Sequence, residues 1–275
     1  MPGPFEGAPV TKWLLIINAA VFLLDLLLTS SPQLILRDTW GYYSVEKVFY
    51  QGQIWRLLTF QFLHGSVGHL LGNCIGLFFF GPHIERWMSS RPFLVFYLFC
   101  GLAGVLFYTL LYFTPGIFDN YHPDSPMVGA SAGIFGILAA FYYVAPNARV
   151  LLFFVIPLQM RTLAILYFAM ETAAVLFNWH NAGGSAGHLG GALMGLLMLK
   201  NEKVRKLVIK ISQIGLDQPQ KSKTVKTGKV LREETRSPLE LTKEVDRILD
   251  KISAEGIQSL TPRERETLDK ARKNK

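Results

Sequence analysis

Apolar and polar positions divide this chain into two parts. Long apolar runs follow one another as far as about residue 199, and the remainder is rich in Lys, Glu, Gln and Ser. Because a helix needs about 20 apolar residues to cross a bilayer, these runs predict six membrane-spanning helices. The predicted ranges are 12–30, 67–88, 93–114, 129–146, 161–178 and 186–200.

The segments outside the spans complete the expected organisation. Residues 1–10 lack the basic region of a secretory signal, so we expect the first apolar run to stay in the protein. The apolar piece 150–160 carries Pro157 and is interpreted as an interfacial connection, with an extension of the fourth or fifth span as the alternative. The expected segments are an N-terminal arm at 1–11, a membrane core at 12–200, a basic linker at 201–236 and a helical hairpin at 237–272.

Composition agrees with a membrane protein. Half of the 275 residues are hydrophobic, 17% are charged and the mean hydropathy is +0.28, whereas ordinary soluble domains are about 25% charged. Cys74 and Cys100 both lie in predicted spans and are interpreted as packing residues. The predicted fold class is all-α: a polytopic bundle of six transmembrane helices plus the small C-terminal hairpin.

Lys and Arg gather at alternate ends of the predicted spans, and such residues favour the cytoplasmic side of a membrane. These residues are Lys12, Arg86, Arg91, Arg149, Arg161, Lys200, Lys203, Arg205 and Lys206. We therefore expect a multi-pass protein of the cell (inner or plasma) membrane with both termini in the cytoplasm. The first loop, 31–66, is an exception that carries Arg37, Lys47 and Arg56. Its aromatic residues suit the outer headgroup zone: Trp40, Tyr42, Tyr43, Phe49, Tyr50 and Trp55.

Three predicted spans bring polar side chains to one depth, counted at about 1.5 Å per residue. Ser131 lies near the outer start of the fourth span, and His188 lies near the outer start of the sixth. His69 and Asn73 share one face of the second span, because residues i and i+4 lie on the same side of a helix. Polar groups inside a membrane are costly and usually serve function or pair with one another. Their convergence predicts a site in the outer leaflet.

The chemistry that these residue types favour is nucleophilic hydrolysis. A serine hydroxyl is a weak nucleophile unless a neutral imidazole accepts its proton, and the oxyanion that forms needs hydrogen-bond donors. Ser131 is the candidate nucleophile and His188 the candidate base. His69, Asn73 and the backbone N–H of Ser131 are the candidate donors to the oxyanion.

Glycines around these residues allow close helix contacts, so the bland alternative for the stretch 129–136 is a packing seam. His188, Gly191 and Gly195 lie on one face of the sixth span, and we expect this face to approach the fourth span. Gly129 and Gly133 face away from Ser131 on an ideal helix. They therefore contact a different helix, or Gly129 precedes the helix.

Two acids, Asp25 and Glu171, also fall inside predicted spans. Structural pairing is the favoured interpretation of both, although Asp25 is also a candidate for orienting a histidine. A transporter is a competing class of protein, but it predicts polar groups through the full depth, and here only Glu171 is placed outside the outer half. His64, His69 and His83 lack the spacing of a metalloprotease site, so we expect no metal and no other cofactor.

The sequence motifs together resemble the rhomboid family of intramembrane serine proteases over residues 10–200. The matching motifs are Gly129-Ala130-Ser131, His188-Leu189-Gly190-Gly191, the set His64, His69 and Asn73, the pair Trp55-Arg56, and Phe80-Gly81 with Glu85. One residue departs from the family pattern, because Ala132 stands where a glycine usually follows the serine.

This resemblance implies a catalytic dyad of Ser131 and His188 without a catalytic carboxylate. It also implies that His69 and Asn73 stabilise the oxyanion and that His64 and Gly129 support the site. The substrates would be membrane proteins whose spans contain helix-destabilising residues near their outer ends, because a regular helix hides its carbonyls. The alternative is an inactive rhomboid-like protein that binds membrane clients.

The polar tail carries the net positive charge of the chain. Residues 200–232 contain ten Lys or Arg against two acids, which favours contact with anionic lipids. No aromatic interleaving accompanies this charge, so nucleic acid is not an expected partner. Ser237-Pro238-Leu239-Glu240 and Thr261-Pro262-Arg263-Glu264 are typical of helix starts. They predict a hairpin that docks an unknown partner.

Overall fold

A computed structural model describes most of the chain in two separate units. The units are residues 1–218 and 219–275. The first is described over 3–28, 36–152, 155–179 and 181–213; in the second, the described residues are 247, 248, 250, 251, 260, 261, 264 and 267.

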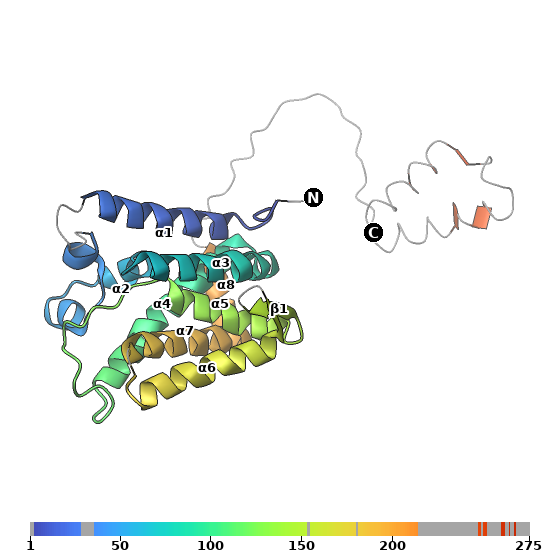
Figure 1. Cartoon of the computed structure of the whole chain (residues 1–275). Coiled ribbons are helices and arrows are strands. Elements are labelled where there is room, and N and C mark those ends of the chain that lie inside the picture. Colours follow the sequence, from blue (N-terminus) through green and yellow to red (C-terminus); the bar gives the residue numbers. More distant parts are fainter. Residues whose placement is uncertain are drawn as a thin grey trace. The chain divides into compact units, whose positions relative to one another are not determined.

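The first unit contains all six helices that the hydrophobic pattern predicts (Figure 1). They are α1 (Pro9–Leu28), α3 (Val67–Met88), α4 (Ser90–Tyr112), α5 (Ser131–Val144), α6 (Met160–Leu176) and α7 (Ala182–Lys200). In the described part of the chain, α1, α3, α4 and α7 are long and apolar enough to cross a membrane. The predicted fold class, an all-α polytopic membrane bundle, is confirmed.

Helix α5 is shorter than the others, with 14 residues. Every residue from Ala132 to Ala140 is buried, so neighbouring helices rather than lipid enclose most of its length. A helix needs about 20 apolar residues only where lipid surrounds it. The predicted span at 129–146 is therefore right in position but two residues too long at each end, because the helix runs from Ser131 to Val144.

Glycines bring α7 against α5 and α4. A Cβ added at Gly191 would lie 2.0 Å from the carbonyl oxygen of Ala132, and one at Gly195 would lie 2.9 Å from that of Gly136. The expectation that the glycine face of the last span approaches the fourth span is confirmed. Gly133 instead faces the ring of Tyr97 on α4. Helix α5 therefore packs closely between α7 and α4.

The first loop folds into four short elements: η1 (Leu36–Gly41), η2 (Glu46–Tyr50), α2 (Arg56–Thr59) and η3 (Phe60–Phe62). Arg56 is only 1% exposed and donates to the carbonyl oxygens of Tyr42 and Thr39 at 2.8 and 2.6 Å. Arg37 pairs with Asp38 at 2.6 Å. These cations are satisfied within the protein, which explains why the loop departs from the charge alternation of the other loops.

The aromatic residues of this loop divide into two groups. Trp40, Tyr50 and Trp55 are exposed, as the headgroup interpretation requires. Tyr42 and Tyr43 are buried, because the Arg56 guanidinium lies over the Tyr42 ring and Tyr43 packs on α4. These two rings are therefore covered by protein, and the position of the loop at the headgroups stays a prediction.

The connection between α5 and α6 is a β-hairpin of β1 (Arg149–Leu152) and β2 (Ile156–Gln159). Pro157 lies opposite Leu151 in this antiparallel pair. The segment is therefore a connection, as predicted, and it extends neither neighbouring helix.

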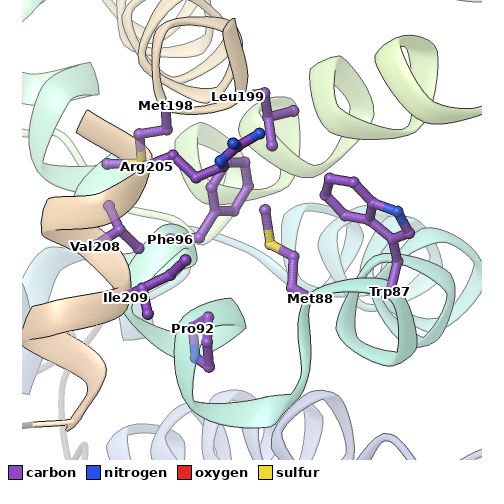
Figure 2. Close-up of a pocket in the computed structure, with 9 residues that line it drawn as sticks. All are labelled: Trp87, Met88, Pro92, Phe96, Met198, Leu199, Arg205, Val208 and Ile209. Carbon is purple, nitrogen blue, oxygen red and sulfur yellow. The ribbon is translucent and has the colours of Figure 1, made fainter. Parts of the chain in front are cut away.

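Helix α8 (Glu202–Gln213) follows α7 within the segment predicted as a linker. Its apolar residues alternate with four basic ones, and Val208 is buried among residues of α4 and α7. This helix was not predicted, because the high charge of the segment masks its apolar face. Figure 2 shows the pocket beside α8, lined by Trp87, Met88, Pro92, Phe96, Met198, Leu199, Arg205, Val208 and Ile209.

In the second unit, Thr261 and Glu264 form the predicted helix start. The Glu264 carboxylate accepts from the backbone N–H and the hydroxyl of Thr261, both at 2.9 Å, and the Glu264 N–H donates back to that hydroxyl at 3.3 Å. These hydrogen bonds, with the nearby Lys251, lower the pKa of Glu264 to about 2. Ser237 and most of the predicted hairpin lie outside the described residues.

Glu85, buried on α3, holds the start of α1. Its carboxylate accepts from the backbone N–H groups of Val10 and Thr11 at 2.9 and 2.7 Å, and from the hydroxyls of Thr11 and Ser90. The first N–H groups of a helix have no partner within it, and a negative charge is favourable there. Glu85 therefore joins α1 to the turn between α3 and α4.

Replacing Glu85 by Gln should lower the free energy of unfolding by about 2 kcal/mol, because charge-assisted hydrogen bonds are lost and an amide N–H₂ meets other donors. Unfolding of the purified protein in detergent measures this loss. Glu6→Gln removes an exposed carboxylate from the segment that precedes α1 and should change stability little. Equal stability of the two variants would contradict the capping role.

Candidate active site

Ser131 and His188 meet across the contact between α5 and α7. The Oγ of Ser131, the first residue of α5, lies 2.8 Å from Nε2 of His188. His188 lies six residues into α7, and its side chain is 17% exposed. The contacts of Gly191 with Ala132 and of Gly195 with Gly136 set this distance, since they bring the two backbones together.

An aromatic ring fixes the plane of the imidazole. Phe135, one turn after Ser131 on α5, stacks on His188 with 4.3 Å between ring centroids and 5° between the planes. The same helix thus supplies both the hydroxyl and the surface on which the imidazole rests. Because Phe135 belongs to an ordinary apolar run, the sequence analysis did not identify its part in the site.

His69 and Asn73 of α3 lie beside Gly129, two residues before Ser131. A Cβ added at Gly129 would lie 2.7 Å from Nε2 of His69 and 3.5 Å from Nδ2 of Asn73. Asn73 is 8% exposed, and its Nδ2 has no hydrogen-bond partner among the described residues. The structure therefore brings both predicted oxyanion donors to the segment that precedes Ser131.

Local hydrogen bonds hold this layer in place. Ser66 caps α3 and accepts from the N–H of His69 at 3.1 Å. Nδ1 of His69 lies 3.5 Å from the N–H of Gly65, a long contact that leaves Nε2 free to carry a proton toward Gly129. The N–H of Gly129 donates to the carbonyl of Phe60 at 2.9 Å. The first loop thereby anchors the chain just before Ser131.

His64 contacts the site through its ring. It is 1% exposed and packs edge-on against His69, with 5.2 Å between centroids. Its contact with the site is therefore through the His69 ring. Burial, and then the neighbouring His69, lower the pKa of His64 to about 4. The ring is therefore neutral near pH 7.

Ala132, which departs from the family pattern, fits because its neighbours are glycines. Its Cβ faces Gly104 of α4, where an added Cβ would lie 2.6 Å away. Its carbonyl faces Gly191 of α7. The extra methyl group therefore occupies space that Gly104 leaves, and the start of α5 retains regular helix geometry.

The two intramembrane acids have different partners. Asp25 accepts from the backbone N–H groups of Leu36 and Arg37 at 2.7 and 3.2 Å, so it pairs with the first loop, as favoured. Glu171 lies 3.1 Å from Nδ1 of His188. Its placement outside the polar layer was wrong. The helical phase contains the missed signal, because Glu171 shares the buried face of α6 with Ala164 and Ala174.

The helical bundle holds a serine hydroxyl, an imidazole and the unpaired Asn73 amide donor in one layer. This arrangement is typical of intramembrane hydrolase-like proteins. The family model described as Rhomboid domain matches residues 51–200 of this chain. The chain therefore belongs to the rhomboid family, a family of intramembrane proteases. A second model, a family of unknown function (DUF6576), matches residues 239–274.

Several curated proteins are similar to the membrane part of the chain. RHOMBOID-like protein 12, mitochondrial, of Arabidopsis thaliana is 31% identical over 54% of this chain and 46% of its own length. Rhomboid protease GluP of Bacillus subtilis is 33% identical over 51% of this chain and 25% of its own. Rhomboid protein 1, mitochondrial, of Saccharomyces cerevisiae is 32% identical over 50% of this chain and 38% of its own length. The chain thus spans less than half the length of each.

Gly129→Ala should destabilise the protein by about 2 kcal/mol or more, because Gly129 has a φ of +125° and an added Cβ would meet the His69 ring. Gly72→Ala, on the same α3 as His69 but in open space, is the matched control and should be neutral or slightly stabilising. Thermal unfolding in detergent compares them. Equal midpoints would show that the chain before Ser131 is not constrained as described.

Proposed function

We propose that this protein is an intramembrane serine endopeptidase that uses Ser131 as nucleophile and His188 as general base. The observation that carries the proposal is the 2.8 Å contact between Oγ of Ser131 and Nε2 of His188. A neutral imidazole that accepts the hydroxyl proton is the usual means of activating a serine. Family membership supports the same reaction class.

The reaction follows from the groups around Ser131. Oγ attacks the scissile carbonyl carbon while its proton passes to Nε2 of His188, which later gives this proton to the leaving amine. Water then hydrolyses the acyl-enzyme by the same route. The oxyanion accepts from Nδ2 of Asn73, from Nε2 of His69 and from the N–H of Ser131, which lies in the first turn of a helix and has no partner within it.

Asn73 is the donor with the strongest support. An unpaired buried donor costs about 1–3 kcal/mol, and Nδ2 of Asn73 is such a group in the described part of the chain. A developing oxyanion would satisfy it, so this cost in the resting protein becomes stabilisation of the transition state. Gly129 contributes by leaving space beside this donor and His69.

The substrates are membrane proteins with a locally unwound span. The site lies about 9 Å along α7 from its start, counted at 1.5 Å per residue, so a peptide bond must reach it from within or beside the bilayer. A regular helix hides its carbonyls in hydrogen bonds, which favours spans with Gly, Ser or Pro near the cleavage point.

Orientation follows from the basic residues at the opposite ends of the helices. Lys12, Arg91 and Arg161 lie in the first turns of α1, α4 and α6, Arg86 lies in the last turn of α3, and Arg149 begins β1. Because such residues favour the cytoplasm, we propose that both termini lie there and that the site faces the outside, with the cell membrane as the expected location. The basic residues of α8 then face anionic lipid headgroups.

Ser131→Ala and His188→Ala should each lower cleavage of a single-span reporter by at least about 10⁴-fold, because the residues of such a pair act as a unit. Cleavage by the purified protein in detergent measures this. His83→Ala and Ser212→Ala change the same residue types far along α3 and on α8, and should retain full activity. Equal product from all five proteins would remove the protease proposal and favour an inactive client-binding member of the family.

A further inference from the structure

Glu171 is a charged residue on a face of α6 that is otherwise buried and apolar. Met160, Leu163, Ala164, Ala174 and Val175 share this face. The side chain of Glu171 is 9% exposed, and its Oε1 lies 3.1 Å from Nδ1 of His188. A charge is costly in such a place unless it is paired, and the partner on this face is the imidazole that already contacts Ser131.

We propose that Glu171 is a positioning residue for His188, so that the site is a triad of Ser131, His188 and Glu171. The proposal rests on the proposed function and departs from the dyad that the family resemblance implies. Oγ of Ser131 and Oε1 of Glu171 lie at opposite nitrogens of one imidazole ring, at 2.8 and 3.1 Å. This is the order of groups in a hydrolytic triad.

The Glu171 carboxylate determines which ring nitrogen of His188 carries the proton. An ionised carboxylate accepts hydrogen bonds only, so it favours the imidazole with its proton on Nδ1. Nε2 then presents a lone pair to the Ser131 hydroxyl, as a general base must. With the proton on Nε2, the ring would donate to Ser131 and could not activate it.

Glu171 also stabilises the imidazolium that forms when the Ser131 proton reaches Nε2. The proton on Nδ1 stays where it is, and the carboxylate balances the new positive charge across a short distance. Besides Glu171, His188 interacts with Ser131 on α5 and, electrostatically, with His69 on α3. Ser185, one turn earlier on α7, interacts with the same carboxylate. Glu171 is the anionic group in this set.

The Nδ1–H of His188 is not yet aligned with the carboxylate closely enough for a hydrogen bond. Hydrogen bonds of catalytic groups are often long or poorly aligned without substrate and tighten in the complex. Stacking on Phe135 holds the ring in its plane, and rotation within that plane is the movement that the stacking allows. Asp25, the other buried acid, differs from Glu171 because it accepts from backbone N–H groups of the first loop and not from His188.

The test compares cleavage of the single-span reporter by the full chain and its Glu171→Gln, Glu171→Asp and Asp25→Asn variants in detergent. Glu171→Gln should lower kcat by about 10²- to 10⁴-fold with KM unchanged, because the tautomer is lost and binding is not. Glu171→Asp keeps the charge and should recover part of that loss. Asp25→Asn, which also removes a buried acid, should lower stability but leave kcat of the folded fraction unchanged.

A second measurement needs no turnover and no variant of Glu171. ¹⁵N NMR of histidine-labelled protein, with the His188 signals assigned by their loss in His188→Asn, should find the proton of the neutral ring on Nδ1. A proton on Nε2 would overturn the proposal, as would a Glu171→Gln variant whose kcat per folded molecule equals that of the wild type. If the folded wild type cleaves no reporter, the proposed function fails, and the NMR result still decides the pairing of Glu171 with His188.

Discussion

The approach of α5 and α7 to backbone contact determines where the reactive groups of this protein lie. Gly191 faces the carbonyl of Ala132, and Gly195 faces Gly136. Side chains at these positions would hold the helices several ångströms apart, and Oγ of Ser131 and Nε2 of His188 would no longer meet at 2.8 Å. Small residues at a helix interface therefore do more here than strengthen packing. They set the geometry of the site.

Several buried polar groups with structural tasks are hydrogen-bonded to the backbone, whereas a buried donor beside Ser131 is not. Glu85 and Asp25 accept from backbone N–H groups, and Arg56 donates to backbone carbonyls. Asn73 instead retains a free donor among the described residues. An unsatisfied donor is expensive in a low-dielectric interior, so its position beside Gly129 accords with a role that arises only during the proposed reaction.

Sequence patterns predicted the six helices and the convergence of Ser131, His188, His69 and Asn73, because hydrophobic length and residue counting along a helix carry that information. They did not predict Glu171 as a neighbour of His188. Counting from the ends of α6 misjudged its depth, and only its phase with the buried alanines of that helix indicates that it faces the bundle. Phe135 was missed for another reason, since an aromatic residue in an apolar run has no distinguishing chemistry until its neighbours are known. Helix α8 was missed because basic residues dominate its composition.

The central claim is that an imidazole activates the Ser131 hydroxyl inside the membrane bundle, and labelling with a fluorophosphonate followed by peptide mass spectrometry tests it most directly. The account predicts a single covalent adduct on Ser131 in the wild type and its absence in a folded His188→Ala protein, because an unactivated serine reacts too slowly with the reagent. Equal labelling of Ser131 in both proteins, or no labelling of folded wild type, would contradict it.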